Sequence, residues 1–192
     1  SPLGPEETMA TKDALGWTAP AFEIPSHLKS AWQAAGARGE DARLAWESRL
    51  AALPLAKKEE FIRRQSHALP KAYGEAVDAA RVALFAEPKR AATRKASQMA
   101  LEALAPALPE MIGGSADLTG SNLTRVKAVD QQYTREVPGR YIGYGVREFG
   151  MSAAMNGINL HGGFIAYGGT FLVFSDYARN AIRLSALMGV GT

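Results

Sequence analysis

Apolar positions recur with helical spacing through the first half of the chain, between proline and glycine residues that interrupt the pattern. Pro25 and Ser26 mark the start of the first helix, and Gly36 marks its end. Pro70 separates two later helices and Pro88 ends the last of them. The spacing predicts helices over 26–36, 41–53, 57–68 and 71–87. Residues 1–25 contain several prolines and are predicted to be extended or irregular.

The pattern changes after Pro109, where short apolar runs begin to alternate with helical stretches. Strands are predicted around 111–112, 141–146 and 164–167, and helices over 94–108, 148–160 and 170–188, with Thr93 as an N-cap. Strands that alternate with helices indicate a parallel sheet with helices on its faces. We therefore predict an α/β fold, a partial parallel sheet with flanking helices, preceded by a mostly helical connector.

We expect two parts, residues 1–88 and 89–192. A parallel sheet of two or three strands leaves faces and edges uncovered, so we expect the second part to be a truncated domain of a longer chain.

Composition excludes several classes of protein. The chain has 192 residues, 47% of them hydrophobic and 21% charged, and no cysteine. A disulfide scaffold, a thiolate metal site and a cysteine nucleophile are therefore excluded. No apolar run is long enough to predict a membrane span.

The net charge is +3, and the densest basic stretch is Lys89, Arg90, Arg94 and Lys95. Such a stretch is typical either of a solvated helix start or of a binding site for nucleic acid or phosphate.

A first polar segment, 113–124, follows a predicted strand and reads GGSADLTGSNLT. In open parallel sheets ligands collect at the carboxyl ends of strands, and glycine lets the backbone approach them closely. Asp117, Ser121, Asn122 and Thr124 supply polar groups. The alternative is a turn closed by its own Asp and Ser side chains.

A second segment places Glu148 where a strand gives way to a helix. The helix dipole favours a carboxylate there, so Glu148 is either a simple cap or an acid positioned to share a proton with a ring nitrogen. In a third segment Phe171, Phe174 and Tyr177 recur every three residues. They predict one aromatic helix face, which either joins the core or sandwiches a flat heterocycle.

Three stretches together, GGSADLTGSNLT, YIGYGVREFGMSAAMNGI and YGGTFLVFSDYARNAIRLSALMG, resemble the pyrimidine-binding domain of transketolases in order and spacing. The earlier segments PLG, LGW, FEIP and TRKASQ are also similar to this family. The resemblance implies that 1–88 are the tail of the diphosphate-binding domain plus a connector. It also implies that 89–192 are the first part of the pyrimidine-binding domain of a thiamine-diphosphate enzyme.

The resemblance also implies roles for individual residues. Glu148 matches the catalytic glutamate that contacts the pyrimidine N1′ of thiamine diphosphate. Other matched positions are cofactor-binding or bind the substrate phosphate. The cofactor-binding set is Phe174, Phe171, Tyr177 and Asp117, and the phosphate-binding set is Arg94 and Ser121. A divalent metal, Mg²⁺ or Ca²⁺, is expected in an upstream domain and none within these residues.

By resemblance, the complete enzyme reversibly transfers a two-carbon ketol group from a ketose phosphate to an aldose phosphate in the pentose phosphate pathway. It would act as a cytoplasmic homodimer with its active site between subunits, and without nucleic acid or membrane partners. The 192 residues alone are expected to be inactive. Two alternatives stay open: another thiamine-diphosphate enzyme, such as a deoxyxylulose-phosphate or dihydroxyacetone synthase, or a noncatalytic basic domain.

Overall fold

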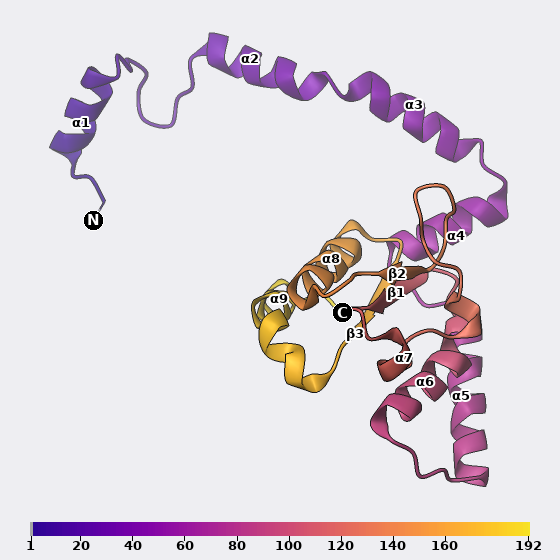
Figure 1. Cartoon of the computed structure of the whole chain (residues 1–192). Helices are drawn as coiled ribbons and strands as arrows, with labels where there is room; N and C mark the ends of the chain where they lie inside the picture. The colour runs from indigo at the N-terminus through magenta and orange to yellow at the C-terminus, as the bar shows by residue number, and fades with distance from the viewer. Residues whose placement is uncertain (1) are drawn as a thin grey trace. The chain divides into compact units, whose positions relative to one another are not determined.

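The computed structural model describes residues 2–192 and divides the chain into two compact units (Figure 1). The first unit ends at Pro54, and the second runs from Leu55 to Thr192. No helix in the described part of the chain is long and apolar enough to cross a membrane.

The first unit consists of three helices, α1 (Pro5–Ala14), α2 (Ser26–Ala37) and α3 (Glu40–Ala51). The prediction of irregular structure before residue 25 is wrong for α1. Pro5 stands at the start of this helix, where its missing N–H has no cost, and two glutamates follow in the positively polarised first turn. Sequence reasoning gave too much weight to the prolines and too little to these start signals.

A left-handed glycine ends α1. Gly16 has φ +64°, and its N–H donates to the Asp13 carbonyl while the Trp17 N–H donates to the Lys12 carbonyl. These two bonds are the Schellman arrangement, which satisfies the last carbonyls of a helix. None of the residues of α1, α2 and α3 is buried, and the Trp32 side chain is 83% exposed.

The second unit opens with helices that follow the predicted pattern: α4 (Leu55–Gln65), α5 (Lys71–Ala86) and α6 (Thr93–Leu104), with the short helix η1 (Ala105–Ala107). The predicted N-cap at Thr93 is wrong by one residue. Ala92 is the capping position, in an extended conformation with no side-chain hydrogen bond, and Thr93 is the first helical residue.

The predicted parallel sheet is confirmed. It has three strands in the order β2-β1-β3, formed by β1 (Met111–Ser115), β2 (Tyr141–Gly143) and β3 (Ile165–Gly169). Both pairings are parallel, with Gly113 opposite Tyr141 on one side and Tyr167 on the other. An added Cβ at Gly113 would overlap the Tyr167 carbonyl, so the glycine allows the central strand to approach its neighbour.

Between and after the strands lie two short helices, α7 (Thr119–Asn122) and η2 (Lys127–Val129), then α8 (Glu148–His161), η3 (Leu172–Phe174) and α9 (Ser175–Met188). The predicted strand through Val146 and the predicted helix from 170 are both too long. β2 ends at Gly143 and Gly145 has φ +69°, while Phe171, just before η3, is extended.

Side chains on opposite faces of the sheet enter two separate cores, because successive strand residues point to opposite sides. Ala166 packs with Ala116, Met151 and Met155 on the side covered by α8. Its neighbour Tyr167 packs on the other side, against the cluster of Ala105, Val126 and Val129. Figure 1 shows α8 and α9 lying together beside this sheet.

Candidate active site

The three sequence segments singled out above meet at the carboxyl edge of the sheet. Asp117 follows β1, Glu148 follows β2, and Phe171 and Phe174 follow β3. Since the strands are parallel and adjacent, their carboxyl ends lie at the same edge. The fold thus gathers side chains that are up to 57 residues apart in the chain, counting from 117 to 174.

A cavity of about 540 Å³ lies at this edge. Four residues singled out in the sequence line it, namely Asp117, Glu148, Phe174 and Tyr177. Its other walls come from Ala116, Leu118 and Val146, which sequence reasoning did not select. These three are direct neighbours of selected motif residues, and their apolar character gave no separate signal.

Glu148 is the first residue of α8 and only 8% exposed. As the first helical residue, Glu148 lies at the positive end of the helix dipole. The capping residue before it, Arg147, makes no side-chain hydrogen bond to the helix end. Within residues 2–192 no hydrogen bond or ion pair involves the Glu148 carboxylate. A carboxylate that has no protein partner and opens into a cavity from a largely buried residue is suited to exchange a proton with a ligand.

The aromatic residues form one row of neighbouring rings, stacked between Phe171 and Phe174 and tilted between Phe174 and Tyr177, although they do not share one α-helix. The ring centroids of Phe171 and Phe174 are 6.1 Å apart with an interplanar angle of 20°, and those of Phe174 and Tyr177 are 6.1 Å apart. η3 brings residues three apart into line, because a 3₁₀-helix has three residues per turn. Phe174 and Tyr177 line the cavity, and Phe171, which is not among the lining residues, stacks on Phe174.

Asp117 is exposed and has φ +60°, in the left-handed region. A side chain in that conformation is strained, and such strain concentrates at functional sites. The turn beneath it is closed by Ser115, whose Oγ accepts a hydrogen bond from the Leu118 N–H at 3.0 Å. The alternative of a turn closed by its own side chains therefore holds for Ser115, whereas Asp117 remains available to a ligand.

The structure does not bring Arg94 and Ser121 into this cavity. Both side chains are exposed, Arg94 on α6 and Ser121 on α7, and these two helices contact one another. Asn122 and Thr124, offered as ligand-binding polar groups, are buried and bond to each other at 2.9 Å. Their polar atoms hold the loop together instead of facing a ligand.

Two tyrosines near the sheet are shielded from water. Burial raises the pKa of Tyr144 and of Tyr167 above the ordinary tyrosine value, because the phenolate is disfavoured away from water. The Tyr167 hydroxyl donates to the Thr124 carbonyl at 3.0 Å, whereas the Tyr144 hydroxyl is buried without a partner in the described part of the chain.

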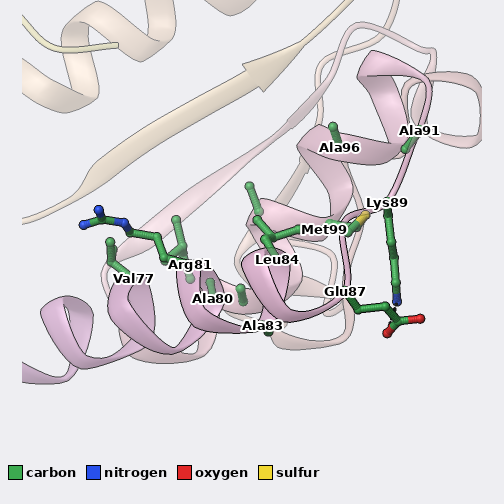
Figure 2. Close-up of a pocket in the computed structure, with 13 residues that line it drawn as sticks. Val77, Ala80, Arg81, Ala83, Leu84, Glu87, Lys89, Ala91, Ala96 and Met99 are labelled. Atoms are coloured by element: carbon green, nitrogen blue, oxygen red, sulfur yellow. Dashed lines mark ion pairs between the residues drawn. The ribbon is translucent and has the colours of Figure 1, made fainter.

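A second large hollow is an apolar groove of about 470 Å³ between α5 and α6 (Figure 2). Leu84 and Met99 line it, and at its rim the Lys89 ammonium pairs with Glu87 at 3.6 Å. The groove has no unpaired acid or nucleophile, so it offers no catalytic group. One cation of the basic stretch is thereby partly neutralised, which weakens the basic-domain alternative.

No group of three or more His, Cys, Asp or Glu residues in the range 2–192 could hold a metal ion.

Family models match most of the chain. The model for the transketolase pyrimidine-binding domain matches residues 89–192, and the transketolase thiamine-diphosphate-binding domain model matches residues 1–70. The chain belongs to the transketolase family. The aromatic row and Glu148 lie within the matched pyrimidine-binding region.

Individual transketolases agree with this. The transketolase of Cereibacter sphaeroides is 54% identical over 99% of this chain, and the chromosomal enzyme of Cupriavidus necator is 52% identical over 98%. The chain spans only 28% of the length of either of these relatives.

Solved transketolase structures share the fold. The Pichia stipitis transketolase in complex with sedoheptulose-7-phosphate matches 97% of this chain and 29% of its own, with a TM-score of 0.77 and 33% identity. The Leishmania mexicana transketolase matches with a TM-score of 0.77 and 35% identity over 97% of this chain. These matches agree with an α/β fold built on a parallel sheet.

Proposed function

We propose that these residues form part of an enzyme that transfers a two-carbon ketol group from a ketose phosphate to an aldose phosphate with thiamine diphosphate as cofactor. The observation that carries the proposal is the buried Glu148 carboxylate, which has no protein partner in residues 2–192 and faces a cavity walled by Phe174 and Tyr177. A flat heterocycle with a basic ring nitrogen complements both features.

The residues of the cavity fit the pyrimidine ring of thiamine diphosphate. Phe174, supported by Phe171, and Tyr177 would hold the ring faces, and Glu148 would share a proton with the ring nitrogen N1′. Asp117, which also lines the cavity, would contact the cofactor as well. When bound, the cofactor supplies the electron sink for carbon–carbon bond cleavage. This chain contributes orientation of the ring, exclusion of water and one proton held at Glu148.

Sugar phosphates are the proposed substrates, supported by the sedoheptulose-7-phosphate complex of the Pichia stipitis relative. Arg94 and Ser121 are the proposed phosphate contacts. The guanidinium of Arg94 offers paired donors that suit phosphate oxygens, and both residues are exposed on neighbouring helices. We propose that they bind the end of the substrate that lies farthest from the cofactor ring.

A second copy of the chain is the proposed cover for the open side of the cavity. Val146, which lines the cavity, is 75% exposed, and two exposed apolar residues lie close in sequence to lining residues, Phe149 at 49% and Leu172 at 88%. The exposed part of α8 adds small residues that permit close approach, Gly150, Ala153, Ala154 and Gly157. A patch of this kind on a surface marks an interface, and a homodimer would complete the site.

The rest of the proposal concerns the complete polypeptide. Residues 1–88 would be the tail of the diphosphate-binding domain and a connector, and 89–192 the first part of the pyrimidine-binding domain. A divalent metal, Mg²⁺ or Ca²⁺, would bind in the remainder of the diphosphate-binding domain. We propose a cytoplasmic enzyme of the pentose phosphate pathway, without nucleic acid or membrane partners, and expect no activity from these 192 residues alone.

The test is Glu148→Gln in a complete transketolase that contains these residues. Loss of proton exchange at the ring nitrogen should lower kcat by at least about 100-fold, the usual range for a positioned acid–base group. Glu75→Gln, at an exposed glutamate on α5, is the matched control and should leave kcat unchanged. Turnover of Glu148→Gln near that of the parent would remove Glu148 from the mechanism.

Product analysis with xylulose and ribose phosphates completes the test. Formation of the two ketol-transfer products supports a transketolase. A deoxyxylulose-phosphate synthase or a dihydroxyacetone synthase would give different products from its own substrates.

A further inference from the structure

A chain of buried hydrogen bonds runs beneath the turn that carries Asp117. It joins all three strands, because its members follow or belong to β1, β2 and β3. Its members, in order, are Thr119, Tyr141, Thr124, Asn122, Ser115 and the carbonyl of Gly169.

The first half of this series of hydrogen bonds ends at Asn122. The Thr124 hydroxyl donates to Asn122 Oδ1 at 2.9 Å, so its single hydrogen is used there. Tyr141 must therefore donate to Thr124 Oγ1, at 2.9 Å, and Thr119 must donate to the Tyr141 hydroxyl, at 2.6 Å. Every hydroxyl hydrogen in this half points toward Asn122.

The second half starts from the other end of the same amide. Asn122 Nδ2 donates to Ser115 Oγ at 2.8 Å, and Ser115 donates its hydrogen to the Gly169 carbonyl at 3.2 Å. Ser115 Oγ also accepts from the Leu118 N–H at 3.0 Å. Because Asn122 supplies a donor, the Ser115 hydrogen stays directed at the Gly169 carbonyl. The second lone pair of Ser115 Oγ then accepts from the Leu118 N–H.

We propose that Asn122 is a positioning residue for the cavity, and this inference rests on the proposed function. Asn122 is 8% exposed and contacts no cavity surface itself. It acts through Ser115 and Leu118, and so holds Asp117 in its left-handed conformation at the cavity wall. An amide is required because one end must accept and the other must donate.

Asn122→Asp tests the requirement for a donor with almost no change of shape. The carboxylate oxygen that replaces Nδ2 carries no hydrogen and faces Ser115 Oγ at close range. Ser115 must turn its hydrogen from the Gly169 carbonyl to this oxygen, which breaks the link to β3 and leaves a charge in a buried site, so the 115–118 turn loosens. The matched control is Asn159→Asp, since Asn159 also uses both ends of its amide, toward Gly191 and Ala166. Asn159 does not line the cavity.

Amide hydrogen exchange measures the loosening of the 115–118 turn without any ligand. In a complete transketolase containing these residues, Asn122→Asp should speed exchange of the Leu118 amide by about tenfold or more. The Ile165 amide, at the opposite end of the sheet, should keep its parent rate in this variant, and Asn159→Asp should leave the Leu118 rate unchanged. An unchanged Leu118 rate in Asn122→Asp would overturn the inference, as would an equal rise in both variants.

Calorimetric titration measures how the change in the turn affects the Kd of the cavity for thiamine diphosphate. Asn122→Asp should raise the Kd about tenfold, while Asn159→Asp stays within twofold of the parent. An unchanged Kd in folded Asn122→Asp would overturn the link to the cavity. A parent protein that binds no thiamine diphosphate would instead refute the proposed function, and the exchange result would still decide whether Asn122 holds the turn.

Thr124→Val serves if Asn122→Asp does not fold. It is similar in shape and removes the hydroxyl that donates to Asn122 Oδ1 and accepts from the Tyr141 hydroxyl. Faster Leu118 exchange with a raised Kd supports the inference, and parent values of both would overturn it.

Discussion

Replacement of Arg63 by methionine should strongly destabilise the start of the sheet. The Arg63 guanidinium donates to Glu110 Oε1 at 2.8 Å, to Glu60 at 2.7 and 2.8 Å, and to the Ala68 carbonyl at 2.5 Å. Glu110 immediately precedes β1 and is only 4% exposed, and its Oε2 has no partner in the described part of the chain. One arginine therefore ties α4 to the central strand.

The magnitude follows from the burial of Glu110. Arg63→Met leaves this carboxylate without its cation, and an unpaired buried charge costs about 3–5 kcal/mol. Glu110→Gln should cost about 1 kcal/mol, because it removes the charge yet keeps an acceptor for Arg63. The double variant Arg63→Met/Glu110→Met should cost less than Arg63→Met alone, since neither charge is then stranded. Arg81→Met, in the exposed pair with Asp78 on α5 of the same unit, is the control and should cost no more than about 1 kcal/mol.

The assay must report on the second unit. All three tryptophans, at 17, 32 and 46, lie in the first unit, so their fluorescence is unsuitable. Native-state hydrogen exchange of the Ile165 amide is suitable, because it donates to the Glu110 carbonyl at 3.1 Å. The reasoning is refuted if Arg63→Met lowers the protection of this amide by less than about 1 kcal/mol, or if the double variant loses as much protection as Arg63→Met alone.

Three further outcomes are expected. Gly169→Ala should cost about 1–3 kcal/mol, measured by thermal unfolding, because the new Cβ would overlap Thr124 Cγ2; an unchanged Tm would contradict this packing. Phe174→Ala should raise the Kd for thiamine diphosphate at least about tenfold by calorimetry, whereas Asn180→Ala on exposed α9 should not. Hydrogen bonds from two arginines lower the pKa of Glu60 from 4.5 to about 2, so its contribution to stability is complete above pH 4.5 and is lost as the pH falls toward 2. Acid unfolding should show that loss in the parent but not in Glu60→Gln.

The site could be predicted from sequence where one residue and its neighbours determine the geometry. Glu148 was expected at a strand-to-helix junction, and it is the first residue of α8 after β2. The aromatic spacing was also informative, though for a different reason: η3 aligns Phe171 and Phe174 where an α-helix was expected. A spacing of three is compatible with both helix types, so sequence alone did not separate them.

Other features depend on contacts that a sequence pattern does not record. The polar groups of Asn122 and Thr124 look the same in the sequence whether they face a ligand or each other, and only the packing of three strands decides this. Tyr141 was expected simply as a strand residue, yet its hydroxyl joins the buried chain. α1 was missed because the prolines around it obscured its helix start signal.

The order of the strands has a practical consequence. β1 is flanked on both sides and the outer edge of β2 bonds to residues 131–133, whereas the outer edge of β3 pairs with no other strand in residues 2–192. Main-chain donors and acceptors along such an edge can recruit a strand from another molecule. Preparations of this segment by itself are therefore prone to edge-to-edge self-association, and a lysine introduced at the rim of β3 is the simplest remedy to try.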